Sequence, residues 1–121
     1  MKYSIPNKRE LNDLEITFLK HIFKKENLEW FNIIDELKVV ARCGCGKCPT
    51  ILFGKTFESE IQTGDLKIDY LAKGKNEELI GVMIFGNKKM PFELEFYSID
   101  GEFDITEIPN IKTLKPLIEN Q

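Results

Sequence analysis

Three cysteines, the only ones in the chain, stand within the six-residue run CGCGKC at positions 43–48. Thiolates are good ligands for zinc, and one turn could orient two or three of them toward the same ion. A structural zinc site usually has four ligands, whereas the single histidine, His21, lies well outside this run. A carboxylate or a thiol of a second chain would have to complete the site, so zinc is one of several chemistries open to this turn.

Cys45 and Cys48 also have the C-x-x-C spacing of thiol–disulfide enzymes. In those enzymes the first cysteine lies at the start of a helix, which lowers its pKa, whereas Pro49 here leads into a predicted strand. The simpler interpretation is structural, since Gly44 permits a tight connection and cysteine packs well when buried. We therefore expect Cys43, Cys45 and Cys48 to be reduced and mostly buried, with no cofactor. A metal-binding or thiol-dependent enzyme built on this turn remains the alternative.

Glu93 and Glu95 offer a second possible chemistry. Two residues apart on one strand, their side chains would point to the same face about 6.5–7 Å apart, which overlaps the spacing of carboxylate pairs in hydrolases. A Cys–His pair would require His21, within an apolar helical pattern, to approach the cysteine turn. Any exposed strand face has such carboxylates, so we expect no catalytic residues and a protein that is not an enzyme.

A β-hairpin over residues 79–98 must position these carboxylates. Residues 79–85 form an apolar run of strand length that is closed by Gly86-Asn87. Apolar and polar side chains then alternate from Phe92 to Tyr97 with a period of two. This alternation predicts a buried face on the second strand and an opposite face that carries Glu93, Glu95 and Tyr97.

The first 37 residues predict two helices joined as a helical hairpin. Asn7 is a plausible N-cap, because Glu10 stands at the capping-box spacing three residues later. An apolar stripe follows at helical intervals: Leu11, Leu14, Phe18, Leu19, Ile22 and Phe23. Apolar residues between positions 30 and 37 predict a short second helix.

Strand patterns recur at residues 38–42, 49–53 and 66–70, and the tail from 101 onward is broken by Pro109 and Pro116. The expected architecture is therefore α+β, with an N-terminal helical hairpin packed on a four- or five-stranded antiparallel sheet. We expect a single domain over 1–121, with a helical part at about 7–37, a sheet part at about 38–100 and an irregular tail at 101–121.

Charge and cysteine usage restrict the binding partners and the cellular compartment that we expect for this chain. The net charge is −3, and residues 57–107 carry twelve Asp and Glu against five Lys, which argues against a nucleic-acid-binding face. No apolar run approaches the roughly 18 residues that span a membrane. No signal-peptide pattern follows the first residues, and clustered cysteines in odd number suit a reducing compartment. We expect a cytoplasmic protein that binds neither nucleic acid nor membrane.

The acidic residues near the end of the predicted sheet suggest a docking surface for a basic partner. Five residues are the candidates for partner contact: Glu93, Glu95, Tyr97, Asp100 and Glu102. Carboxylates around an aromatic anchor would speed association with a cationic protein and select for it. The alternative is an ordinary solvated surface.

Two motifs carry a resemblance to a family of small, uncharacterised bacterial proteins. They are the R-C-G-C-G-x-C-P turn at 42–49 and the L-E-x-Y-S-x-D-G strand end at 94–101. In size, charge and architecture the chain also resembles bacterial immunity proteins, including those of contact-dependent growth inhibition. That second resemblance implies a non-enzymatic antitoxin whose partner is a toxin with a basic surface, such as a nuclease domain. A general protein-interaction module is the other possibility, and the oligomeric state stays open.

Overall fold

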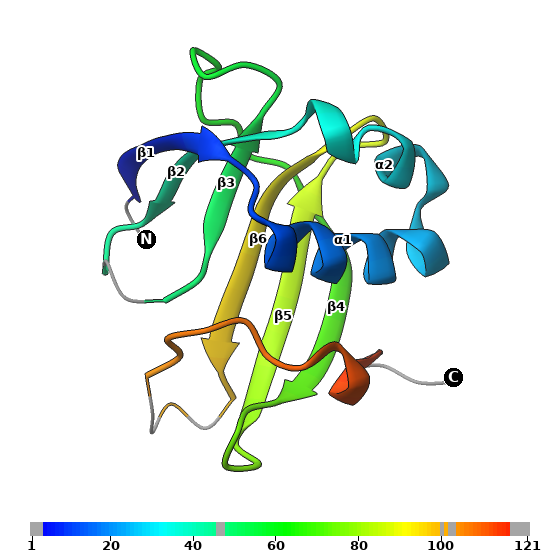
Figure 1. Ribbon diagram of the computed structural model, residues 1–121, viewed down its shortest axis with the longest axis vertical. Helices are drawn as coiled ribbons and strands as arrows, with labels where there is room; N and C mark the ends of the chain where they lie inside the picture. The colour runs from blue at the N-terminus through cyan, green and yellow to red at the C-terminus, as the bar shows by residue number, and fades with distance from the viewer. Residues whose placement is uncertain (1–3, 46–47, 100, 102–103, 117–121) are drawn as a thin grey trace.

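The computed structural model describes residues 4–45, 48–99, 101 and 104–116. One antiparallel sheet organises the chain, with seven strands in the order β1-β2-β3-β6-β5-β4-β7 (Figure 1). The strands are β1 Ser4–Glu10, β2 Lys38–Cys43, β3 Ile51–Gly54, β4 Asp65–Lys73, β5 Leu79–Gly86, β6 Pro91–Ser98 and β7 Lys115–Pro116. The helices are α1 Asp13–Glu26 and α2 Leu28–Asn32, with short 3-10 turns at η1 Ile34–Glu36 and η2 Ile111–Thr113. The α+β class is confirmed, but the sheet has seven strands instead of four or five.

The predicted hairpin is the centre of this sheet. β5 pairs with β6 on one side and with β4 on the other, and both pairs are antiparallel. The Asn87 side chain closes the β5–β6 connection, because its Oδ1 accepts hydrogen bonds from the backbone N–H groups of Lys89 and Met90 at 2.8 and 2.9 Å. Local turn chemistry therefore fixes the register of the two strands that carry the candidate carboxylates.

The prediction that a helix begins near Asn7 is wrong. Residues Ser4–Glu10 form strand β1, which pairs with β2, and α1 begins after Asn12. Asn12 Oδ1 accepts from the backbone N–H of Glu15 at 2.8 Å, while Glu15 Oε1 accepts from that of Asn12 at 3.0 Å, completing a capping box. The Asn-x-x-Glu pattern occurs twice in this region, and the second copy is the cap. Pro6 is tolerated in β1 because this strand lies at the sheet edge.

The helical hairpin is not seen either. α2 spans only Leu28–Asn32, and the chain then passes through η1 into β2. The helical pattern predicts Leu14 in the apolar stripe of the first helix, but Leu14 is 58% exposed. Because α1 begins at Asp13, Leu14 lies in its first turn, beyond the stretch that packs on the sheet.

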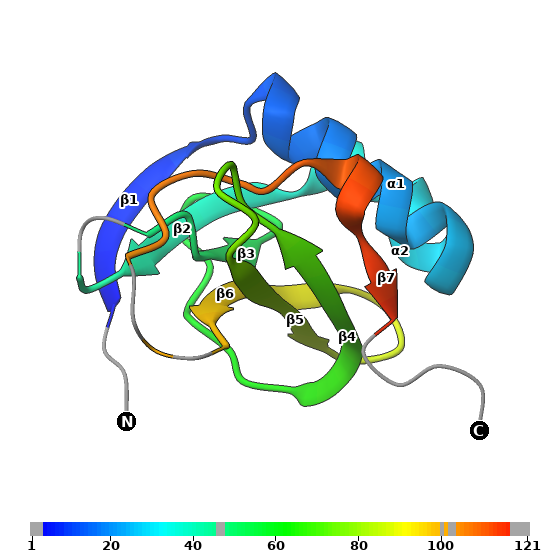
Figure 2. The same ribbon diagram turned by 90° about the horizontal axis from the view of Figure 1, so that it is seen from below.

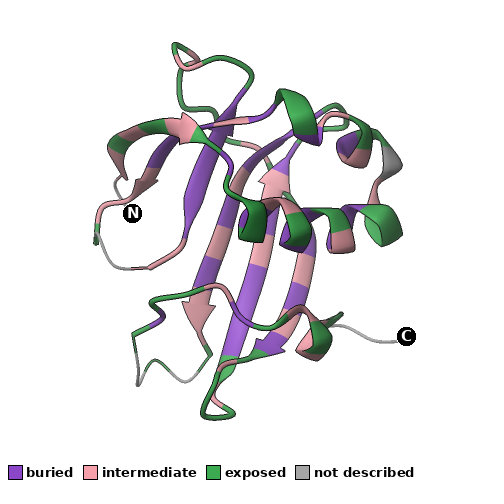
Figure 3. Cartoon of the chain, viewed as in Figure 1, coloured by how far each residue is buried: buried purple, intermediate pink, exposed green. Residues whose placement is uncertain are grey.

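The core lies between the sheet and the helices. In Figure 2 the sheet curves so that its strands surround the core from below and from both sides, while α1, α2 and the tail from residue 104 close the top. Along β4 and β6 buried and half-buried residues alternate, as Figure 3 shows by colour. Phe18 of α1 meets Phe96 of β6 with ring centroids 5.6 Å apart. The sheet thus has one face in the core and one face away from it.

The tail contributes more to the fold than its irregular sequence suggests. β7 pairs with β4, and Ile105 is buried in the core cluster. Ile108, Ile111 and Leu114 pack against that cluster and are partly buried. Within the described ranges, no helix is long and apolar enough to cross a membrane.

Candidate functional site

The face of β4, β5 and β6 that points away from the helices gathers carboxylates and apolar side chains from three strands. The register places Asp69 opposite Met83 and Met83 opposite Glu95, while Leu71, Gly81 and Tyr97 align in the neighbouring row. We call this surface the open face and define it by seven half-buried residues: Asp69, Leu71, Met83, Phe85, Glu93, Glu95 and Tyr97. The predicted grouping of Glu93, Glu95 and Tyr97 on one face agrees with this register.

The apolar members of the open face lie outside the main core. Met83 and Phe85 belong neither to the buried cluster beneath the helices nor to the partly buried residues that pack on it. Leu66, opposite Phe85 on β4, is 46% exposed. Aromatic and apolar side chains next to carboxylates are typical of the centre of a protein–protein interface.

Tyr97 is held in place by its cross-strand neighbour. A Cβ atom at Gly81 would collide with the Tyr97 ring, so the absence of a side chain at Gly81 lets the ring lie over β5. Burial raises the pKa of the Tyr97 hydroxyl, and the nearby charges of Asp69 and Glu95 raise it further. The hydroxyl therefore stays protonated at neutral pH and offers a hydrogen-bond donor on this face.

Asp69 is the most unusual member of the open face. Its Oδ1 is fully buried and has no hydrogen-bond partner among the residues that the structure describes. Burial raises the pKa of this carboxyl above its ordinary value of 3.8. Because the folded state holds this proton more tightly than the unfolded state, the contribution of Asp69 to stability falls as pH rises through the unfolded value toward the folded one.

We expect Asp69→Asn to raise the free energy of unfolding at neutral pH by about 0.5–1 kcal/mol, a small single-substitution effect. The substitution keeps the size of the side chain and removes the partly buried charge. The difference from the wild-type protein should close as the pH falls below 3.8, where both side chains are neutral. Urea unfolding as a function of pH measures this difference, and an equal gain at all pH values would exclude the charge as its cause.

The other two acidic candidates follow β6 in the sequence. Asp100 and Glu102 lie outside the described residues. Glu107 forms an ion pair with Lys75 at 3.0 Å and belongs to the tail, on the helix side of the sheet. Sequence reasoning missed Asp69, although its place between Ile68 and Tyr70 in an alternating strand indicated the polar face.

The cysteine turn follows β2 at the end of the sheet. The three Sγ atoms lie within 4.8 Å of one another, and those of Cys45 and Cys48 are 3.3 Å apart. None of these three described cysteines takes part in a disulfide. The prediction that they are mostly buried is wrong, since Cys45 is exposed and Cys43 and Cys48 are half-buried.

Two backbone N–H groups point at sulfur atoms in this turn. The N–H of Cys45 donates to Cys43 Sγ at 3.5 Å, and that of Cys48 donates to Cys45 Sγ at 3.3 Å. The pKa of Cys43 is raised to about 11, chiefly by burial, while the hydrogen bond from the Cys45 backbone acts in the opposite direction. Without a metal ion, Cys43 is therefore a thiol at neutral pH and a poor nucleophile.

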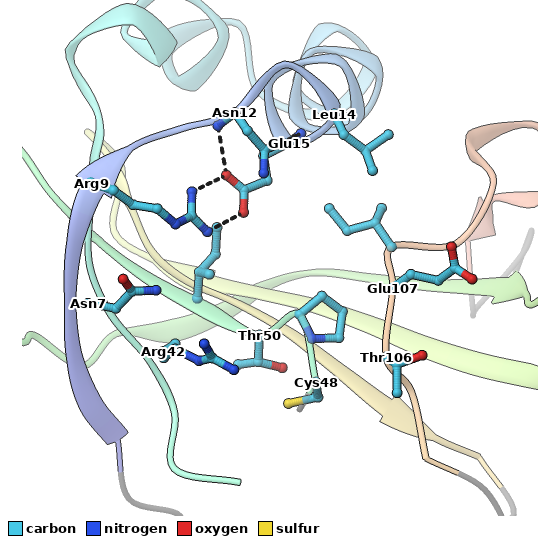
Figure 4. Close-up of a pocket in the computed structure, with 13 residues that line it drawn as sticks. Asn7, Arg9, Asn12, Leu14, Glu15, Arg42, Cys48, Thr50, Thr106 and Glu107 are labelled. Carbon is cyan, nitrogen blue, oxygen red and sulfur yellow. Dashed lines mark hydrogen bonds and ion pairs between the residues drawn. The ribbon is translucent and has the colours of Figure 1, made fainter. Parts of the chain in front are cut away.

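Two cavities flank the turn. The larger, about 350 Å³, lies between β1, β2, the start of α1 and the tail, and Figure 4 shows its lining. Arg9 crosses this cavity and binds Glu15 through two parallel hydrogen bonds of 2.8 Å each, while Arg42 and Cys48 lie below them. The smaller, about 150 Å³, is lined by Cys43, Leu52 and Glu93 among others, so it joins the turn to the edge of the open face.

Comparisons with known proteins do not identify a family for this chain. No protein-family model matches the chain, and no curated protein or solved structure matches it either. The resemblance of the 42–49 turn to small bacterial proteins therefore stays a prediction.

Proposed function

We propose that this protein is a non-enzymatic binding protein that captures a basic partner protein through the open face. The observation that carries the proposal is the placement of Asp69, Glu93 and Glu95 around Tyr97 and Met83 on one half-buried sheet surface. Carboxylates attract a cationic surface over long range, and the apolar side chains gain burial on contact.

The strands make this surface suited to a macromolecule. Its members lie on the paired strands β4, β5 and β6, whose cross-strand hydrogen bonds hold the side chains in fixed rows. A preordered surface loses little conformational freedom on binding, which favours affinity. The two cavities beside the cysteine turn lie at the margin of the open face or on the helix side. Their position favours a macromolecule over a small molecule as the partner of this face.

Within this class, the partner we propose is a toxin domain, and a nuclease in particular. A nuclease has to attract phosphate, so its cleft carries lysine and arginine. An inhibitor that presents carboxylates to the cleft mimics the negative charge of the phosphates and so excludes the nucleic acid from the cleft. Electrostatic steering would speed this capture, which protects a cell only if it outpaces the toxin. The protein would then act as an immunity protein, in line with its resemblance in size and charge.

The proposal predicts an association rate that depends on salt and on two carboxylates. The partner is first isolated by affinity purification from the cells that encode this chain, and association is then followed by stopped flow. The rate should fall as the salt concentration passes about 0.15 M, where the Debye length is about 8 Å. Glu93→Lys/Glu95→Lys should slow association at low salt by about tenfold or more.

A charge-matched control separates steering from net charge. Glu29 and Asp35 are exposed and belong to α2 and η1 on the helix side, so Glu29→Lys/Asp35→Lys changes the net charge equally without touching the open face. The control should change the rate much less, and thermal melts should show that both variants are folded. Equal rates for the two variants, or a rate independent of salt, would mean that the open face is only a solvated surface.

Co-expression tests the toxin proposal separately from the docking proposal. If the isolated partner is toxic when expressed alone, the wild-type chain should restore growth and Glu93→Lys/Glu95→Lys should restore it less well. If the partner is harmless but still binds through the open face, the chain is a general interaction module and the immunity role is excluded.

A further inference from the structure

We propose that Cys43, Cys45 and Cys48 together bind one thiophilic d10 metal ion, Zn²⁺ or Cu⁺, through three thiolates. This site adjoins the edge of the open face through the smaller cavity, but it does not depend on the proposed partner. Three thiols in a single surface turn make a soft donor set, which favours these ions over Mg²⁺ or Ca²⁺.

The distances between the sulfur atoms fit a shared ion. With a Zn–S bond of about 2.3 Å, three thiolates around one ion lie about 3.8–4.0 Å apart. The three Sγ atoms are already within 4.8 Å of one another, and the shortest separation, between Cys45 and Cys48, is 3.3 Å. Displacements of about half an ångström would therefore place all three at bonding distance from a common centre.

The backbone of the turn supplies an independent observation. The N–H of Cys45 donates to Cys43 Sγ, and the N–H of Cys48 donates to Cys45 Sγ. Donors directed at sulfur stabilise the thiolate more than the thiol, and such outer contacts orient the ligands of metal sites. A turn that only had to pack its cysteines as small apolar groups would not need to direct N–H groups at two of them.

Exposure also favours a ligand role over a packing role. Cys45 is exposed and the other two cysteines are half-buried, so an ion could enter from solvent. Among the described residues no fourth Cys, His, Asp or Glu joins the cluster, and Gly46 and Lys47 offer no such side chain. Cu⁺ is satisfied by three thiolates, whereas Zn²⁺ would take water or a ligand from another molecule in its fourth position.

Metal titration of the reduced protein tests the site directly. Samples kept free of oxygen are titrated separately with Zn²⁺ and with Cu⁺, and with Co²⁺ as a spectroscopic probe for the zinc geometry. We expect one ion per chain, proton release on binding and a sulfur-to-cobalt charge-transfer band. Competition between Zn²⁺ and Cu⁺ against chelators of known affinity then decides which ion the site prefers.

Single substitutions identify the ligands. Cys43→Ser, Cys45→Ser and Cys48→Ser should each weaken binding by more than the ~10–100-fold seen when an outer contact is lost. The control is His21→Asn, which removes the only imidazole in the chain and should leave affinity unchanged. In the wild-type protein, bound metal should also protect all three thiols from alkylation, a readout that holds even if a serine variant does not fold.

Three results would overturn the proposal. The reduced protein could bind none of the ions, or the serine variants could bind them as tightly as the wild type. The third result is a Cys45–Cys48 disulfide in protein isolated from cells with a reducing cytoplasm. The 3.3 Å separation of the two Sγ atoms would then reflect a redox pair and not a metal site.

Discussion

Replacing Arg9 by Met should lower the free energy of unfolding by about 3 kcal/mol, the lower end of the range for removing one partner of a buried ion pair. Glu15 is 3% exposed, and its two oxygens accept hydrogen bonds from Arg9 Nη1 and Nη2 at 2.8 Å each. Without Arg9 the carboxylate stays buried, and among the described residues it keeps only its capping contact to the Asn12 backbone. Arg9 is 35% exposed at its side chain, so water relieves part of the loss.

A second substitution distinguishes an orphaned charge from lost packing. Glutamine keeps the capping-box contact that Glu15 makes but carries no charge. Arg9→Met/Glu15→Gln should therefore regain most of the stability that Arg9→Met loses. Urea unfolding of the wild type, both single variants and the double variant gives the coupling energy. Additive losses would show that the pair is not energetically coupled and that the buried charge of Glu15 does not cause the loss in Arg9→Met.

The same pair also shapes the larger cavity. Arg9 comes from β1 and Glu15 from α1, so their contact joins the edge strand to the helix that covers the core (Figure 4). Loss of this contact should loosen β1 before it loosens the central strands. Hydrogen exchange in Arg9→Met should therefore rise in Ser4–Glu10 while the β5–β6 pair stays protected.

Trp30→Ala should cost about 3–5 kcal/mol, the range for truncation of a large buried aromatic side chain. Trp30 is fully buried, and its ring makes an edge contact with Phe23 at 5.2 Å between centroids. Its Nε1 donates to the carbonyl oxygen of Asn87 at 3.0 Å. Trp30 therefore fastens α2 to the turn between β5 and β6, and its removal leaves both a cavity and an unpaired carbonyl.

Trp30→Phe separates the effect of the cavity from the effect of the lost hydrogen bond. Phenylalanine fills much of the space but cannot donate to Asn87, so we expect an intermediate loss of about 1–3 kcal/mol. Circular dichroism is the suitable probe, since Trp30 is the only tryptophan and the variants lose its fluorescence. A loss below about 1 kcal/mol for Trp30→Ala would show that the turn and α2 are held by other contacts.

The central part of the sheet could be predicted from the amino-acid sequence alone. The strands between residues 38 and 98 have apolar runs or a period-two alternation that depends only on the chain's own geometry. The turn at Asn87 is made by local hydrogen bonds. The same alternation placed Glu93, Glu95 and Tyr97 on one face. Such features are local, so a pattern of side chains is enough to predict them.

The two ends of the sheet depend on tertiary pairing. The Asn7 and Asn12 segments carry the same Asn-x-x-Glu signal, and only the pairing of β1 with β2 shows that the first is a strand. β7 spans two residues and exists as a strand only through its pairing with β4. Hydrogen bonds between segments far apart in the sequence leave no local pattern, which is why these strands could not be predicted.

The content of both candidate sites also depends on the tertiary structure. Asp69 and Met83 join Glu95 on the open face because the register of β4, β5 and β6 aligns them, and register depends on pairing. The identity of the three thiols was plain from the sequence, but their exposure depends on what covers the turn. Burial is a property of the whole packed chain. The residue types were therefore enough to suggest the three cysteines as metal ligands, but only the fold shows that solvent reaches them.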